Sequence, residues 1–153
     1  MRLMRRKIDD FLKEWKENED RLPLIVKGAR QIGKTASIMQ FANDNYRNVV
    51  AINFVLQQKF KSIFDDGYDV DSVVRNITLI NPNIELEPGN TIFFFDEMQD
   101  CPVCATSLKA FKIDGRYDVV CSGSLMGINY QEIESNSVGS VSYTHLTLPT
   151  ILL

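Results

Sequence analysis

Apolar positions fall into two patterns along this chain, a helical stripe and a short continuous run. Residues 7–18 carry one stripe, made of Ile8, Phe11, Leu12 and Trp15. Their spacing of i, i+3, i+4 and i+7 places the four side chains on one face, which predicts an amphipathic helix. The same period predicts helices over residues 35–45 and 105–112 and helical patches over residues 59–64 and 70–80.

Short runs of almost continuous apolar residues lie between these helices. They cover residues 22–27, 49–55, 91–95 and 117–121. Strands that are apolar on both faces are typical of a parallel sheet buried between layers of helices. We therefore predict an α/β fold, a three-layer sandwich with a mostly parallel sheet, preceded by the amphipathic helix over residues 7–18.

The composition is that of an ordinary globular domain. The chain has 153 residues, 44% of them hydrophobic and 24% charged, and its net charge is −3. This charge gives no general basic field of the kind that attracts nucleic acids. The basic N-terminus is not followed by the apolar run of a secretory signal, and no segment approaches the roughly 18 apolar residues of a membrane span. We expect a cytoplasmic protein without a membrane segment.

Candidate chemistry begins with the sequence GARQIGKT at residues 28–35, which matches the pattern G-x-x-x-x-G-K-[ST] at every fixed position. An apolar run precedes it and an amphipathic segment follows, the strand–loop–helix context that this phosphate-binding loop requires. Lys34 is expected to reach the β- and γ-phosphates of a nucleotide, and the Thr35 hydroxyl to bind Mg²⁺. The backbone N–H groups that would surround the phosphates belong to Gly28, Ala29, Arg30, Gln31, Ile32, Gly33, Lys34, Thr35 and Ala36.

An acidic pair, Asp96 and Glu97, follows the apolar run over residues 91–95. Carboxyl ends of parallel strands are where ligands lie in open α/β sheets, so the position suits a nucleotide site. Asp96 is the candidate for holding magnesium through its water shell, and Glu97 for orienting or deprotonating the attacking water. A solvated acidic pair at a strand end is the alternative interpretation.

A third polar element, Ser122-Gly123-Ser124, follows the apolar run that ends at Cys121. A hydroxyl at the tip of this strand is placed to sense the γ-phosphate and hold the water. Both Ser122 and Ser124 qualify, and the sequence does not decide between them. A plain polar turn at Gly123 is the alternative.

Two other features, the cysteines and Arg116, each allow a functional and a structural interpretation. Cys101 and Cys104 form a CxxC, but zinc needs four ligands, and Cys121 and His145 are the remaining candidates. We interpret the cysteines as reduced thiols. Arg116 precedes a predicted strand, so we expect it to pair with Asp114 or Asp118 rather than to contact a phosphate.

The stretches GARQIGKT, FDEMQ, CSGSL and KIDGRYD together resemble a family of bacterial and archaeal ATPases in the AAA-type branch of P-loop NTPases. The resemblance covers about residues 5 to 139. It implies a core with strand order 5-1-4-3-2, with Asp96 and Glu97 on the third strand and the sensor on the fourth. In that family a fifth strand, a small helical region and a C-terminal domain of unknown function follow the core.

The chain departs from this pattern after Gly139. Residues 141–150 match, codon by codon, an in-frame translation of a transposase adapter used in sequencing libraries. We interpret residues 1–140 as a truncated ATPase core that lacks its fifth native strand, and residues 141–153 as an artefactual tail that includes His145. The alternative is a genuine β-prone tail. We expect the P-loop strand to have an unpaired edge, where the apolar tail would fit by coincidence.

These patterns predict ATP binding and Mg²⁺-dependent ATP hydrolysis, coupled to a partner or process that the sequence does not identify. Alternatives are a non-hydrolysing nucleotide-binding regulatory module and a P-loop kinase for a small molecule. Glu97 favours hydrolysis, because a kinase has no need of a water-activating glutamate. We expect a protein or nucleic-acid partner to act through the missing C-terminal region. The sequence leaves the oligomeric state open and assigns efficient turnover to the complete protein.

Overall fold

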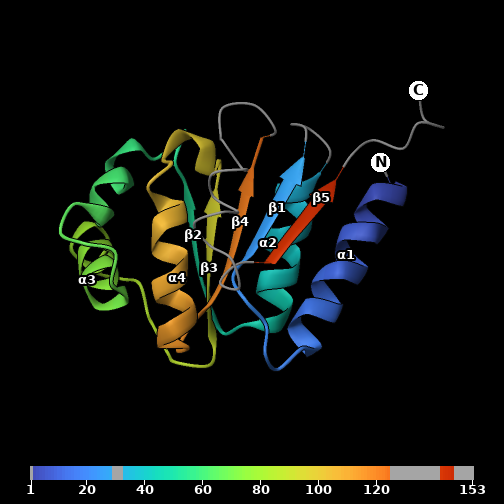
Figure 1. The fold of residues 1–153 in the computed structure, drawn as a ribbon, viewed down its shortest axis with the longest axis horizontal. Helices are drawn as coiled ribbons and strands as arrows, with labels where there is room; N and C mark the ends of the chain where they lie inside the picture. The colour runs from blue at the N-terminus through green and yellow to red at the C-terminus, as the bar shows by residue number, and fades with distance from the viewer. Residues whose placement is uncertain (1, 29–32, 125–141, 147–153) are drawn as a thin grey trace.

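A five-stranded parallel sheet forms the middle layer of the molecule (Figure 1). The computed structural model describes residues 2–28, 33–124 and 142–146. Its strands are β1 (Leu24–Gly28), β2 (Asn48–Asn53), β3 (Thr91–Asp96), β4 (Asp118–Gly123) and β5 (Ser142–Leu146). Their order is β2-β3-β4-β1-β5, and each neighbouring pair is parallel. The predicted fold class is confirmed, and the order is the one that the family resemblance implies.

Helices cover both faces of the sheet. One face packs against α1 (Arg2–Glu17) and α2 (Lys34–Asn45), and the other against η1 (Gln58–Phe64), α3 (Val70–Ile80) and α4 (Cys104–Asp114). A further 3₁₀ turn, η2 (Met98–Asp100), follows β3. The first helix starts earlier than the stripe over residues 7–18 predicts, because residues 2–6 contain only good helix formers. In the described part of the chain, no helix is long and apolar enough to cross a bilayer.

β3 illustrates why the strands of this sheet carry apolar side chains on both faces. All six of its residues are buried, and alternate side chains point to opposite faces. Phe93 and Phe95 pack beside Phe111 of α4, with the Phe93 and Phe111 ring centroids 5.4 Å apart. Ile92 and Phe94 belong to the second core cluster, which α1 and α2 cover. Two hydrophobic layers therefore hold β3, and Asp96 at its end, in a fixed position.

The outer edge of β1 is paired with β5. The register runs from Leu24 opposite Ser142 to Gly28 opposite Leu146. The tail segment therefore lies along the edge of β1 that would otherwise be unpaired, which is where we expected an apolar tail to fit.

Candidate nucleotide site

The predicted phosphate loop connects β1 to α2 at the edge of the sheet to which the strand arrows point (Figure 1). β1 ends at Gly28 and α2 begins at Lys34. Between them Gly33 has φ 80° and ψ 11°, the left-handed conformation that glycine adopts at little cost. Ala29, Arg30, Gln31 and Ile32 lie outside the described residues. Gly28 and Gly33 are thus the described residues on either side of the loop.

Lys34 lies between the ends of β1 and β4. Its side chain is buried, and Nζ donates hydrogen bonds to the carbonyl oxygens of Gly28 and Gly123, each 2.9 Å away. A buried ammonium group is costly unless hydrogen bonds satisfy it, and these two carbonyls do so in part. The lysine thus places a positive charge at the carboxyl edge of the sheet, as the motif predicts.

Asp96 joins three elements at this edge. Its Oδ2 accepts a hydrogen bond from the Thr35 hydroxyl, 3.2 Å away, although the two residues are 61 positions apart. Its Oδ1 accepts hydrogen bonds from the Ser122 hydroxyl and from the Glu97 backbone N–H. Asp96 is only 5% exposed. A hydroxyl and a carboxylate in contact are oxygen ligands of the kind that Mg²⁺ prefers, so this donor set fits the ion.

Glu97 has a left-handed backbone, with φ 57° and ψ 48°. Among the described non-glycine residues it is the one with positive φ, a conformation that costs on the order of 1 kcal/mol and is common at functional sites. This turn starts η2 and sends the chain back toward β4. The Glu97 carboxylate accepts a hydrogen bond from the Gln99 side-chain amide.

The two candidate serines have different surroundings. Ser122 is fully buried, and its hydroxyl donates to Asp96. Ser124 is half-buried, and its backbone N–H donates to the Gln99 amide oxygen 3.2 Å away. Ser122 is therefore placed to orient the predicted metal ligand, whereas Ser124 lies at the tip of the strand. Sequence reasoning missed Gln99, although its place two residues after Glu97 was a signal for it.

A family model described as "AAA domain" matches residues 20–150. The chain belongs to the AAA domain family. A comparison with curated proteins gave no match. Membership of this family implies a nucleotide ligand.

Three solved structures share the fold of this AAA domain. PCH-2 of C. elegans matches with TM-score 0.54 and 14% identity, over 94% of this chain and 43% of that one. The Drosophila ORC structure bound to GC-rich DNA and Cdc6 matches with TM-score 0.59 and 11% identity, over 97% and 59%. Thermotoga maritima RuvB T158V matches with TM-score 0.54 and 14% identity, over 97% and 45%. The AAA domain thus spans about half of the length of these chains.

The three cysteines of this AAA domain are free thiols. Cys101, Cys104 and Cys121 are all buried, and burial raises the pKa of the Cys101 and Cys104 thiols. Within residues 2–28, 33–124 and 142–146, no group of three or more possible ligands is arranged to hold a metal. Zinc binding by the CxxC therefore receives no support from the described residues.

Proposed function

We propose that this AAA domain binds ATP with magnesium at the carboxyl edge of the sheet and hydrolyses it. The observation that carries the proposal is the contact between Thr35 and Asp96, with 3.2 Å between Oγ1 and Oδ2. The contact joins the start of α2, which follows the phosphate-loop motif, to the end of β3. Lys34 supplies the positive charge beside them.

In this proposal the backbone of residues 28–36 surrounds the phosphates, and Lys34 contacts the β- and γ-phosphates. Thr35 and Asp96 would hold Mg²⁺, which neutralises the charge that develops on the phosphate oxygens. Ser122 keeps the Asp96 carboxylate oriented through the hydrogen bond to Oδ1.

Glu97 is the proposed residue for orienting or deprotonating the attacking water. It lies next to Asp96 at the end of β3, where a water beside the γ-phosphate would be in reach. Ser124, at the tip of β4, is the proposed γ-phosphate sensor. A water-activating glutamate at this point favours hydrolysis over a small-molecule kinase and over a non-hydrolysing module, because neither transfers phosphate to water.

Phosphate release and nucleotide binding, measured together, test this proposal. We expect Glu97→Gln to bind MgATP like the unaltered protein and to release phosphate at least about 100-fold more slowly. Lys34→Ala should weaken ATP binding by about tenfold or more, because it removes a charge that pairs with phosphate. Lys109→Ala, an exposed lysine on α4, is the matched control and should change neither quantity.

Two results would contradict the proposal. Equal rates of phosphate release by the unaltered protein and Glu97→Gln would remove Glu97 from the mechanism. Unchanged ATP affinity in Lys34→Ala would remove the phosphate loop itself.

We also propose that the partner coupled to hydrolysis, a protein or a nucleic acid, is bound by a part of the whole protein other than this core. One structural neighbour, Drosophila ORC, is bound to DNA. The net charge of −3 gives this chain no general attraction for DNA. Fluorescence anisotropy with labelled duplex DNA should therefore show no binding by the chain alone at physiological salt. Tight binding would assign the nucleic-acid contact to this core.

The division into a core over residues 1–140 and a foreign tail over residues 141–153 stays a prediction, as does the cytoplasmic location. Sequencing the gene directly from its source across codons 139–153 tests the division. A different sequence after Gly139 would support a foreign tail, and the same sequence would make β5 a native strand.

A further inference from the structure

Gln99 lies between the proposed water-activating residue and the end of β4. Its amide oxygen accepts the hydrogen bond from the Ser124 backbone N–H, at 3.2 Å, and its amide nitrogen donates to the Glu97 carboxylate. A backbone N–H can only donate, so the amide oxygen must face Ser124. The NH₂ group must then face Glu97. The two hydrogen-bond partners thus determine the orientation of the Gln99 amide group.

One peptide unit extends this connection to Lys34. The Gly123 carbonyl oxygen accepts the hydrogen bond from Lys34 Nζ, and the N–H of the same peptide, that of Ser124, donates to Gln99. A continuous chain of hydrogen bonds therefore runs from Lys34 through the end of β4 and Gln99 to Glu97. Hydrogen bonds in such a chain polarise one another and hold their members more firmly than isolated bonds do.

From this geometry we propose that Gln99 is a positioning residue for hydrolysis. It holds the Glu97 carboxylate in the place where water is activated, and it anchors that place to β4. The inference rests on the proposed function, because it gives Gln99 a role only through Glu97. The left-handed backbone of Glu97 leaves its side-chain torsions free, and the hydrogen bond from Gln99 restricts them.

Two substitutions separate the two arms of the amide. Gln99→Met has a similar length but neither donates nor accepts, so it removes both arms. Gln99→Glu keeps an acceptor for the Ser124 N–H but, ionised at pH 8, cannot donate to Glu97. We expect each to lower kcat by about 10- to 100-fold, the cost of a misplaced catalytic group, and to leave MgATP affinity within about twofold. Gln40→Met and Gln40→Glu on the exposed side of α2 are the matched controls and should have no effect.

A double-mutant cycle shows whether Gln99 acts through Glu97. In the Glu97→Gln background, Gln99→Met should cause no further loss of kcat, because the group that it positions is already gone. An equal further loss would show a purely structural role for Gln99 and overturn the inference. A Gln99→Glu variant as active as the unaltered protein would also overturn it, because the Glu97 arm would then be unnecessary.

The same measurements separate failure of the inference from failure of the proposed function. If the unaltered protein binds MgATP but releases no phosphate, or releases it as fast as Glu97→Gln, the proposed function fails and the inference fails with it. If Glu97→Gln is slow while Gln99→Met is as fast as the unaltered protein, the inference alone fails. Retained MgATP affinity in each variant shows that the variant is folded.

Discussion

Asp96 and Asp118 are largely buried carboxylates at the two ends of neighbouring strands, and their partners differ. Asp118, at the start of β4, accepts hydrogen bonds from the Arg21 guanidinium and the Tyr46 hydroxyl, with Arg21 at 2.8 and 3.0 Å. Asp96, at the end of β3, accepts hydrogen bonds from two hydroxyls and a backbone N–H, which are neutral donors. Asp118 is thus paired with a cation, whereas the hydrogen bonds that orient Asp96 come from neutral donors.

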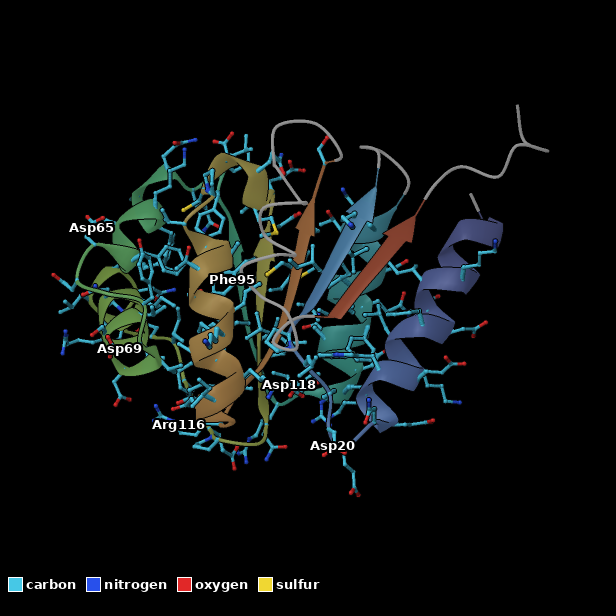
Figure 2. The ribbon with its side chains drawn as sticks, in the orientation of Figure 1. Asp20, Asp65, Asp69, Phe95, Arg116 and Asp118 are labelled. Carbon is cyan, nitrogen blue, oxygen red and sulfur yellow. The ribbon has the colours of Figure 1, made fainter. Side chains whose placement is uncertain are left out.

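This difference separates a carboxylate that joins parts of the fold from the carboxylate that we propose as a metal ligand. Figure 2 shows Asp118 at the lower end of the sheet, opposite the edge at which Asp96 lies. The guanidinium bound to Asp118 ties the connection after α1 to β4, 97 residues away. Neutral donors hold the Asp96 carboxylate in one orientation but supply no positive charge, which leaves its charge for an incoming ion. Substituting each aspartate in turn should therefore give opposite results for activity and stability.

The largest effect is expected for Asp96→Asn on activity. MgATP hydrolysis should fall about 100-fold or more, because a neutral amide is a poor magnesium ligand. Stability should change by less than about 1 kcal/mol, since an amide oxygen still accepts from the Glu97 N–H and hydroxyls rotate to accept from the amide nitrogen. Phosphate release across a magnesium titration, with urea unfolding, measures both. A large stability loss with little change in activity would make Asp96 a structural residue.

The second-largest effect that we expect is a loss of stability in Asp118→Asn. The loss of a partner leaves the partly buried Arg21 guanidinium facing an amide, which should lower the free energy of unfolding by about 2 kcal/mol. For a chain of this size the melting temperature should fall by about 5 °C. ATP affinity and kcat should stay within about twofold, because the pair lies at the far edge of the sheet.

Asp20→Asn is the matched control for this variant. Asp20 is the exposed neighbour of Arg21 and points away from the molecule in Figure 2. Its substitution should change stability by less than about 0.5 kcal/mol. A loss equal to that of Asp118→Asn would mean that general charge near Arg21, and not the bond to Asp118, stabilises the fold.

The contrast between these aspartates also marks what the sequence could and could not predict. Asp96 is recognisable because an apolar run ends at it and the phosphate-loop motif gives it a partner. The Arg21–Asp118 pair is not, because no local pattern shows that a loop after the first helix meets the start of β4. Arg116 does pair with Asp114, as expected, since the two are close in sequence. Local chemistry was thus predictable, and contacts between distant segments were predictable only where a motif connects them.

Gln99 and β5 also show which contacts the sequence could not predict. The sequence gives Gln99 a place beside the site, but its role depends on the Ser124 backbone N–H, which only the packing of η2 against β4 brings near. For β5, the apolar tail was expected to fit the open edge of β1, but its register was not predictable, because strand pairing depends on backbone hydrogen bonds and tolerates many side chains. The fold class could therefore be predicted and candidate site residues could be named, whereas the hydrogen bonds between distant segments could not be predicted.

The smallest effect is expected for Tyr46→Phe, the neutral partner of Asp118. Near pH 8 it should lower stability by about 1 kcal/mol, the value of one hydrogen bond, because Arg21 still compensates the charge. Burial and the bond to Asp118 raise the pKa of the Tyr46 hydroxyl well above its ordinary value near 10. Above pH 10 the unfolded chain therefore loses this proton while the folded chain keeps it, so the unaltered protein should lose roughly 1 kcal/mol between pH 10 and 11 that Tyr46→Phe does not lose.

Urea unfolding of both proteins at pH 8, 10 and 11 measures this difference. The stability gap should be widest below pH 10 and should close as the pH rises, because the stabilising hydroxyl is the group whose proton the unfolded state releases. All other residues are common to the two proteins, so the comparison isolates Tyr46. A gap that stays constant to pH 11 would mean that Tyr46 ionises alike in the folded and unfolded chain. The neutral donor at Asp118 would then contribute packing and not a hydrogen bond, and the charge of that carboxylate would be compensated by its ion pairs with Arg21 and Lys16.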